Sequence, residues 1–457
     1  MQKRHIRNLL LVAVIAALLS GCVAGPQPGP TALPLRPTEA ADFEVADIRE
    51  LMDEMVDAGA PAVFVEVRDG DQVWSSAEGV RSTVTELPAR PGDSVRIASL
   101  TKPMTATILL QLVAEGEAEL DDPIEDYLPG VVQGRDVTIR QLLNHTSGMP
   151  DYVPALALDP SEISAQIVTP ISHEELVELS RTQEWSFDPG TGYEYSNTNY
   201  IVLSMLIEEL TGSTMAEQLA ERIAEPLGLE HTSIPTGTGM GEHAASGYVI
   251  EGPLSIDVTE QDASLWSGAG GVVSTVSDVN TFMRALLSGQ LLPPPLLGEM
   301  LVLVPEGYGL GVQSRTDTCS DGDPAYLELS PGEEPGEGEE GAGGDAEGAD
   351  AAEEQDAPEG EEPDDAPRAT VFGLEEPEEG SGSVHDTEYG ELVQIGEGDH
   401  VYGHLGSGLG YRALTMSSPD GMRQVTIAWT VSPTDYGADP RLDIAYELSE
   451  IALARDC

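Results

Sequence analysis

One segment of the chain is unable to join a folded core, and it divides what remains. Residues 331–367 consist almost entirely of Gly, Pro, Ala, Glu and Asp, and the wider stretch 321–400 holds 28 acidic residues against one base, Arg368. Such a composition buries too little apolar surface to offset the loss of chain entropy on folding. We therefore predict that residues 319–384 form a disordered acidic insert.

Both flanks of this insert carry the periodic patterns of folded structure. We expect strands at 61–68 and 71–77 around an Asp69-Gly70 turn, and at 400–406, 411–417 and 424–431. We expect helices at 43–58, at 101–115 with its apolar residues on one side, at 199–210 and at 439–454. Strands from both chain ends with few βαβ alternations predict one α+β domain, built from residues 43–318 and 385–457. Its antiparallel sheet would be flanked by the N- and C-terminal helices, with a helix-rich subdomain from the middle of the chain.

The N-terminus has the pattern of an export signal. Three bases precede the apolar run 9–19, which is too short to span a bilayer, and Leu19-Ser20-Gly21-Cys22 follows. This pattern resembles a bacterial lipobox, which implies that residues 1–21 are removed and that Cys22 becomes a lipid-modified N-terminus. The alternative is an ordinary signal peptide with a chance cysteine. The Pro/Gly-rich residues 22–42 would tether an extracytoplasmic domain to the cell membrane.

Charge and cysteine content restrict the partners and the covalent links. The formal net charge is -60, which argues against nucleic acid or an anionic lipid surface as a partner. Export implies an oxidising compartment, where Cys319 and Cys457 would either form a disulfide or remain two free thiols. The sequence leaves both readings open, and it does not predict the oligomeric state.

A single lysine stands out once the first 21 residues are set aside. Lys102 is the only lysine in a segment that carries 17 arginines. It follows Ser99 by three residues, and Pro103 places both at the first turn of a helix, where the two side chains share one face. Serine needs a base to become a nucleophile, and a buried lysine can lose its charge and serve as that base. Arginine stays protonated and cannot replace it.

Three motifs in chain order resemble those of the active-site-serine penicillin-recognising hydrolases, which include serine β-lactamases, DD-peptidases and related esterases. They are Ser99-Leu100-Thr101-Lys102, Tyr195-Ser196-Asn197 and His404-Leu405-Gly406. The loop Leu142-Leu143-Asn144-His145-Thr146-Ser147-Gly148-Met149-Pro150 is similar to that of the class C β-lactamase and actinomycete DD-carboxypeptidase branch. The resemblance extends from about Phe43 to Ala454, apart from the acidic insert.

The resemblance implies a role for each matching residue. Ser99 would attack a carbonyl and become acylated, and Lys102 would activate it. Tyr195, as phenolate or hydrogen-bonded phenol, would pass the proton to the leaving group, and Asn197 would orient Lys102 and the substrate amide. Taken alone, Tyr195 could also be a core or surface ring and Asn197 a helix cap. His145 is interpreted as structural, ordering its loop through hydrogen bonds.

The third motif would form the opposite wall of a cleft. His404, expected on the edge strand, would supply positive or hydrogen-bonding character, although it could also be a structural histidine. The backbone N–H groups of Ser99 and Ser407 would form the oxyanion hole. Leu405 and Gly406 would contact substrate, but Leu405 stands where penicillin-binding members usually have a hydroxyl that holds the substrate carboxylate. Arg412 lies close in sequence and is a candidate replacement.

These residues predict a surface-anchored serine hydrolase without cofactor or metal. The histidines at 385, 400 and 404 fit no zinc-ligand spacing. A D-Ala-D-Ala carboxypeptidase-like peptidase is the first interpretation, with small peptide, ester or β-lactam as the substrate. The alternatives are an esterase or β-lactamase of the same fold, and a non-catalytic wall-binding or sensor protein that kept the fold.

Overall fold

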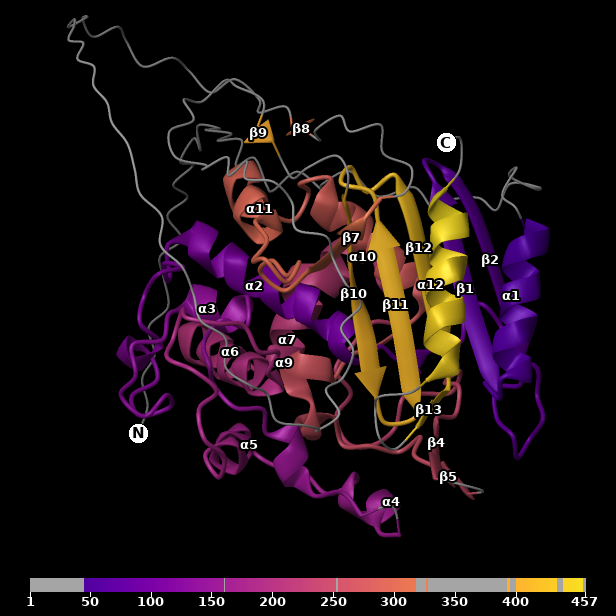
Figure 1. The fold of residues 1–457 in the computed structure, drawn as a ribbon, viewed down its shortest axis with the longest axis horizontal. Helices are drawn as coiled ribbons and strands as arrows, with labels where there is room; N and C mark the ends of the chain where they lie inside the picture. Colours follow the sequence, from indigo (N-terminus) through magenta and orange to yellow (C-terminus); the bar gives the residue numbers. More distant parts are fainter. Residues whose placement is uncertain are drawn as a thin grey trace, which may run out of the picture.

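The computed structural model describes residues 45–159, 161–251, 254–317, 326–327, 393–394, 400–433 and 439–454. A six-stranded antiparallel sheet runs through it (Figure 1), in the order β2-β1-β12-β11-β10-β7. The strands are β1 (Ala62–Asp69), β2 (Gln72–Gly79), β7 (Gln313–Thr316), β10 (His400–Gly408), β11 (Tyr411–Ser417) and β12 (Arg423–Trp429). Strands from the two chain ends meet in this sheet, since Phe64 lies opposite Ala428.

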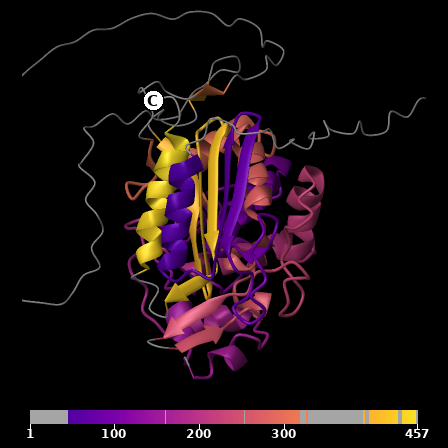
Figure 2. The ribbon, with the colours of Figure 1, turned by 90° about the vertical axis from the view of Figure 1, so that its right-hand side faces the viewer.

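The two terminal helices cover one face of the sheet. The N-terminal α1 (Val45–Asp57) and the C-terminal α12 (Pro440–Leu453) lie side by side against the strands (Figure 2). Met52 of α1 and Leu448 of α12 are fully buried and share one apolar cluster with Trp429 of β12. This confirms the predicted α+β domain with terminal helices flanking an antiparallel sheet.

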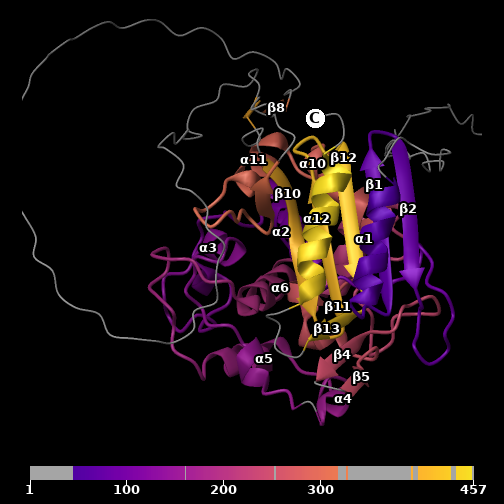
Figure 3. The same ribbon diagram turned by 45° about the vertical axis from the view of Figure 1, so that its right-hand side comes forward.

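The middle of the chain supplies the helices on the other face (Figure 3). The longest are α2 (Thr101–Glu115), α6 (Asn197–Thr211) and α10 (Val276–Leu287). The shorter ones are α3 (Ile139–Leu143), α4 (Ile163–Gln166), α5 (His173–Ser180), α7 (Met215–Leu219), α8 (Glu225–Leu227), α9 (Ser267–Gly270) and α11 (Pro294–Leu301). Small ladders complete the fold: β3 (Val95–Arg96) with β6 (Val273–Ser274), and β4 (Tyr248–Glu251) between β5 (Leu254–Asp257) and β13 (Val431–Pro433).

Helix α2 differs from its prediction in one respect. Its bounds match, and Gly116 ends it in the left-handed conformation (φ 81°) that glycine adopts without strain. The sequence predicts an apolar stripe on one side, whereas every residue from Thr101 to Leu110 is buried. The cause is its central position, because α6, α9 and the turn before α2 all pack against it. Its polar side chains therefore point into protein rather than into solvent.

The other predicted elements are found with small shifts at their ends. The β1–β2 hairpin turns at Gly70-Asp71, one residue later than expected. Helix α6 begins at Asn197, two residues before the predicted start, and ends at Thr211, one residue after the predicted end. Strand β10 continues to Gly408. These shifts are of the size expected when only local pattern defines a boundary.

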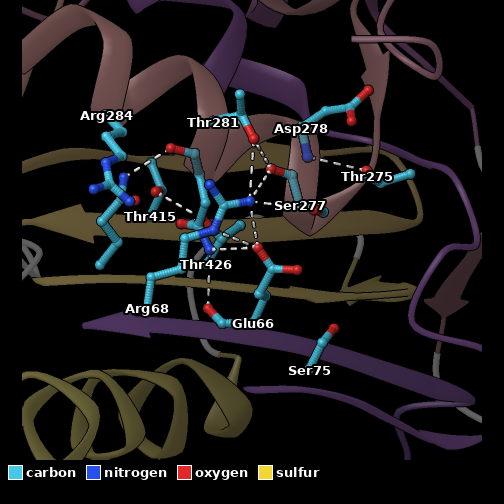
Figure 4. A network of polar contacts seen from close by, with 12 residues as sticks. Glu66, Arg68, Ser75, Thr275, Ser277, Asp278, Thr281, Arg284, Thr415 and Thr426 are labelled. Atoms are coloured by element: carbon cyan, nitrogen blue, oxygen red, sulfur yellow. Dashed lines mark hydrogen bonds and ion pairs between the residues drawn. The ribbon is translucent and has the colours of Figure 1, made fainter. Parts of the chain in front are cut away.

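A polar network is buried between the sheet and α10 (Figure 4). Arg68 of β1 makes an ion pair of 2.7 Å with Glu66 and donates to the carbonyl of Ser277 and the hydroxyl of Thr281. Asn280 of α10 donates to the backbone carbonyl of Glu66. Both charged side chains are 5% exposed or less, so their hydrogen bonds replace the water that they lose.

Several predictions concern residues outside the described part of the chain. These are the signal (1–21), Cys22 and the tether (22–42), Cys319 and Cys457, and almost all of the insert (319–384). Within the insert the structure describes Tyr326–Leu327 (β8), which pairs antiparallel with Val393–Gln394 (β9). Among the described helices, none is long and apolar enough to cross a membrane.

Candidate active site

Ser99 lies in a strained turn that leads into α2. A short 3₁₀ turn, η1 (Ala98–Leu100), directly precedes the helix. Ala98 has φ 48°, a left-handed conformation that costs a non-glycine residue about 1–2 kcal/mol. The strain places the serine at the N-terminal end of α2, where the helix dipole favours developing negative charge.

Lys102 extends from the first turn of α2 into a site closed to solvent. Its Nζ lies 3.1 Å from Ser99 Oγ, 2.8 Å from Asn197 Oδ1 and 2.8 Å from the carbonyl oxygen of Ala269. The side chain is completely buried. No carboxylate of the described residues lies within 4.0 Å of this amine.

Burial changes the charge state of this lysine. Desolvation lowers the pKa of Lys102 to about 7, and the carboxylate of Asp151 opposes that shift only in part. An ordinary lysine would be almost entirely protonated at neutral pH, whereas here the free amine is a major species. The site therefore holds a free amine that is available near pH 7 to accept the hydroxyl proton as general base.

The hydrogen bonds fix the direction in which that base acts. The Nδ2 group of Asn197 donates to Asp151 Oδ2 over 2.9 Å, so its Oδ1 must be the atom that faces Lys102. Asn197 Oδ1 and the Ala269 carbonyl can only accept hydrogen bonds. A neutral lysine gives its two N–H groups to these acceptors, and its lone pair is then left facing the hydroxyl of Ser99.

The Ala269 carbonyl is itself held in place by helices around it. In α9, the carbonyl of Gly268 accepts from Thr105 Oγ1 (2.8 Å) and its N–H donates to Ser204 Oγ (3.2 Å). A Cβ at Gly268 would lie 2.3 Å from Ser204 Oγ, so only glycine fits there. Ser267 Oγ lies 2.8 Å from His173 Nε2. These contacts immobilise one of the three partners of Lys102.

Tyr195 is close to the base but is not a phenolate. Its ring centroid lies 4.8 Å from Lys102 Nζ and 4.3 Å from the ring of His145. Burial raises the pKa of Tyr195 well above its usual value, although a hydrogen bond with Ser99 lowers it in part. Of the two forms that the resemblance implies, the structure favours the hydrogen-bonded phenol, which can relay a proton.

His145 has the structural role predicted for it. Its Nδ1 accepts hydrogen bonds from the backbone N–H of Ser196 and from Asn199 Nδ2. Burial, followed by the nearby charge of Lys102, lowers its pKa well below the usual range, so the ring is neutral. It ties its loop to the start of α6 and packs against Tyr195.

His404 lies on the strand predicted for it, but it does not carry the expected charge. Strand β7 pairs with β10 only as far as Gly403, so among the described residues β10 is the outer strand from His404 onward. The His404 side chain is completely buried, outside the cavity wall, with Nε2 2.9 Å from the hydroxyl of Tyr308. Burial, then the charge of Lys102, lowers its pKa to about 3. The expected positive character is therefore absent, whereas the hydrogen bond with Tyr308 fits the alternative of a structural histidine.

A cavity of about 500 Å³ opens in front of Ser99. Ser99, Tyr195, Asn197, Leu405 and Ser407 all line it, so the structure brings together four of the predicted positions with the nucleophile. Gly406 faces the other way. A Cβ at that position would lie 2.3 Å from the Ile97 carbonyl oxygen, so glycine lets β10 approach the turn that carries Ser99. The oxyanion role of Ser99 and Ser407 stays a prediction.

The structure also places Arg412, which the sequence could not. It lines the same cavity as Leu405 and lies on β11 opposite Ser407. Its Nε lies 3.3 Å from Asp439 Oδ2, and both side chains are almost fully buried. Asp439 also pairs with Arg441 and caps α12. Arg412 is thus held by a carboxylate of the protein.

Asp151 is the site residue that sequence reasoning missed. It follows directly after the loop motif that ends at Pro150, and its carboxylate lines the cavity beside Asn197. In a chain with 81 acidic residues a single aspartate carries no compositional signal. Only the fold shows that it meets Asn197, 46 residues further on. In the described ranges, no group of three His, Cys, Asp or Glu could hold a metal ion.

Comparison with known proteins gives consistent matches. The β-lactamase family model matches residues 47–448. Penicillin-binding protein 4* of Bacillus subtilis is 30% identical over 232 residues, which is 48% of this chain and 50% of that protein. D-aminopeptidase of Brucella anthropi is 30% identical over 48% of this chain and 41% of its own length. The matches thus span about half the length of these relatives.

A solved structure matches over nearly the whole chain. The crystal structure of a D-stereospecific amidohydrolase from Streptomyces sp. is similar with a TM-score of 0.64 and 27% identity. The match covers 90% of this chain and 98% of that one.

Proposed function

The chain belongs to the β-lactamase family and is a serine hydrolase, and we propose that it cleaves an amide bond through an acyl-enzyme on Ser99. The observation that carries this proposal is the buried amine of Lys102, 3.1 Å from Ser99 Oγ with a pKa of about 7. A buried base and a nucleophile within reach are what acyl transfer requires.

Acylation begins when Ser99 Oγ attacks the substrate carbonyl and its proton passes to the lone pair of Lys102. The backbone N–H groups of Ser99 and Ser407 stabilise the oxyanion. The tetrahedral intermediate then expels the amine. Tyr195 gives its phenolic proton to that amine and regains a proton from Lys102, so the base returns to its neutral form.

Deacylation uses the same groups in reverse order. A water molecule in the cavity attacks the ester carbon, and its proton passes through Tyr195 or directly to Lys102. The ester bond breaks, Ser99 Oγ takes the proton back and the acid leaves. Asn197 keeps Lys102 in position throughout, because its amide is anchored by Asp151.

Intact-protein mass spectrometry tests the acyl-enzyme. After incubation with a fluorophosphonate, a penicillin, a D-Ala-D-Ala peptide and a p-nitrophenyl ester, we expect one added acyl or phosphonyl mass located on Ser99. Ser99→Ala should remove it, while Ser161→Ala, a change at an exposed serine, should not. Labelling that persists in Ser99→Ala would refute the mechanism.

As the substrate we propose first a peptide that ends in D-Ala-D-Ala, which would make the protein a carboxypeptidase. The relative in Bacillus subtilis is named a penicillin-binding protein, which favours it. Leu405 lines the cavity without a hydroxyl for a substrate carboxylate, and Arg412 is engaged by Asp439, which argue for other amides or esters. Leu405→Thr should improve kcat/KM for a substrate that ends in a carboxylate. An unchanged ratio to the corresponding amide would show that this position does not contact that group.

A non-catalytic binding role is the alternative from another class. The assembled Ser99, Lys102, Tyr195 and Asn197 argue against it, because a binding protein has no need of a neutral lysine. Turnover of any acyl donor by the wild type excludes this alternative.

Anchoring at the cell surface is proposed from the signal pattern alone. A lipid on Cys22 would keep the domain in the membrane fraction, and Cys22→Ala should release it into the soluble fraction. Equal fractionation of both proteins would contradict a lipid anchor.

A further inference from the structure

The carboxylate of Asp151 faces the cavity without a cation. It accepts hydrogen bonds from the N–H of Val153 (3.2 Å), from Asn197 Nδ2 (2.9 Å) and from the backbone N–H of Asn197. Across the described part of the chain, no lysine, arginine or histidine nitrogen lies within 4.0 Å of it. A carboxylate offers about four acceptor positions, so part of its capacity is left for a ligand.

Keeping a partly buried carboxylate ionised without a cation beside it costs free energy. Burial raises the pKa of Asp151, and the hydrogen bonds from Val153 and Asn197 oppose this only in part. Among the described residues, the cation that acts on it is Lys102, which has a pKa of about 7 and is only partly protonated at pH 7, so it compensates the carboxylate only in part. A cationic group of the substrate would pair with the carboxylate and offset this cost.

The position of the carboxylate defines which substrate group it meets. Asp151 contacts Asn197, Asn197 contacts Lys102, and Lys102 contacts Ser99, each within 3.1 Å. Two side chains, Asn197 and Lys102, thus connect the carboxylate with Ser99, and Asp151 and Ser99 line the same cavity. In an amino-acid amide, the α-amino nitrogen lies two bonds from the carbonyl carbon that Ser99 attacks, so it remains close to that centre.

The surrounding wall suits the remainder of such a molecule. Val153, Trp266 and Leu405 line the same cavity and offer apolar contact to a side chain. Leu405 also lacks the hydroxyl that would hold a carboxylate. The wall therefore favours an apolar group over an anionic one at this position.

The two arginines of the cavity wall already have partners within the protein. The guanidinium of Arg412 faces Asp439. Arg96 donates through its Nη2 to the backbone carbonyls of Thr238 and Gln261. These contacts reduce the capacity of both arginines to hold a substrate anion, whereas the carboxylate of Asp151 can still accept a substrate cation.

We propose that Asp151 forms a subsite for a substrate ammonium group, so that the enzyme acts on amino-acid amides or peptides with a free N-terminal amine. This inference rests on the proposed acyl-enzyme at Ser99. The enzyme would then recognise the acyl donor through its amine rather than through a terminal carboxylate. The competing role for Asp151 is to orient Asn197 alone, in which case the charge of the substrate would not matter.

A matched pair of substrates separates the two roles. We would measure kcat/KM for D-alanine p-nitroanilide and for its N-acetyl derivative, which differ in the ammonium group. The wild type should prefer the free amine. In Asp151→Asn, kcat/KM should fall about 100-fold further for the free amine than for the N-acetyl compound. Asp159→Asn, a change at an exposed carboxylate, is the control and should keep the wild-type ratio.

Other outcomes would overturn the inference. An equal loss for both substrates in Asp151→Asn means that Asp151 acts only through Asn197. A wild type that prefers the N-acetyl compound, or cleaves neither while a fluorophosphonate still labels Ser99, also rejects the ammonium subsite and leaves the acyl-enzyme standing. Absence of any label on Ser99 in the wild type would instead reject the proposed function itself.

Discussion

Two buried basic side chains, Arg68 and Lys102, lie on the helical side of the sheet, and they differ in whether a carboxylate lies beside them. Arg68 lies between β1 and α10, paired with Glu66 at 2.7 Å and bonded to Ser277 and Thr281 (Figure 4). Lys102 lies between α2, α6 and α9, and its three partners are a hydroxyl, an amide oxygen and a backbone carbonyl. The first cation has a carboxylate beside it and the second, among described residues, does not.

This difference explains why one position is arginine and the other lysine. A buried charge needs an opposite charge or it gives up its proton. Arginine keeps its proton and presents a planar fork of donors, which suits the multiple acceptors around Arg68. Lysine releases its proton when burial is uncompensated, and at Lys102 that release creates the base.

Replacing Lys102 with arginine should have the largest effect, and the quantity affected is the acylation rate. Lys102→Arg should reduce the acylation rate by about 1,000-fold, because a permanently protonated guanidinium cannot accept the serine proton. The loss should be as great as in Lys102→Ala. Stopped-flow acylation with a chromogenic ester measures both. An arginine variant with near wild-type turnover would show that Lys102 is not the base.

The reciprocal exchange provides the control. Arg68→Lys keeps the charge but loses the fork, so it should destabilise the fold by about 1–3 kcal/mol while the acylation rate per folded molecule stays the same. A lower acylation rate in this variant would mean that the surroundings of Arg68 affect the active site at Lys102.

Removing the charge partner of Arg68 should have the next largest effect. Glu66→Gln leaves a buried guanidinium without its carboxylate, and we expect a loss of about 3–5 kcal/mol in the free energy of unfolding. Urea denaturation followed by circular dichroism measures it. Glu66→Asp, which keeps the charge, is the matched variant. A loss below about 1 kcal/mol in Glu66→Gln would show that the pair is not needed.

The sequence predicts the group of residues around Lys102 much better than the polar network around Arg68. Ser99 and Lys102 are three residues apart at a helix start, so local geometry alone brings them together. The hairpin of β1 and β2 and the end of α2 at Gly116 follow equally from local pattern. Asn197 and Tyr195 were assigned through the resemblance of a short motif, and their contacts with Lys102 depend on how α6 packs against α2.

What the sequence could not predict depends on distant packing. His404 is neutral because it is buried, and its hydrogen-bond partner Tyr308 comes from 96 residues earlier in the chain, a contact that no local pattern signals. Asp151 acquires its role only where its loop meets the start of α6. The Arg68 network joins residues more than 200 positions apart, and its members look like ordinary surface polar residues in the sequence.

The pH dependence of stability offers a sharper test of the unpaired lysine. The pKa of Lys102 is about 7 in the folded state against an ordinary 10.5. Between these values the unfolded chain binds a proton that the folded protein does not, so stability rises with pH in this window. The rise should be up to about 1.4 kcal/mol per pH unit.

Lys102→Met isolates this contribution because it cannot titrate. The difference in unfolding free energy between wild type and Lys102→Met, measured in urea at pH 6.5, 7.5 and 8.5, should shift in favour of the wild type as pH rises. The acylation rate should increase through the same range, since the base must be deprotonated. Parallel pH profiles of stability for the two proteins would contradict a lowered pKa.

The smallest expected effect on the free energy of unfolding comes from removing one hydrogen bond of Arg68, the bond to Thr281. Thr281 Oγ1 accepts from Arg68 over 3.1 Å and donates to the carbonyl of Ser277 over 2.9 Å. Thr281→Val keeps the shape and removes the hydroxyl, so the fold should lose about 1 kcal/mol, while Thr281→Ser should lose less. The carboxylate of Glu66 still holds the guanidinium in both variants, which is why the loss is small. A loss as large as that of Glu66→Gln would mean that the neutral partners, rather than the opposite charge, keep Arg68 buried, and the contrast with Lys102 would then need another cause.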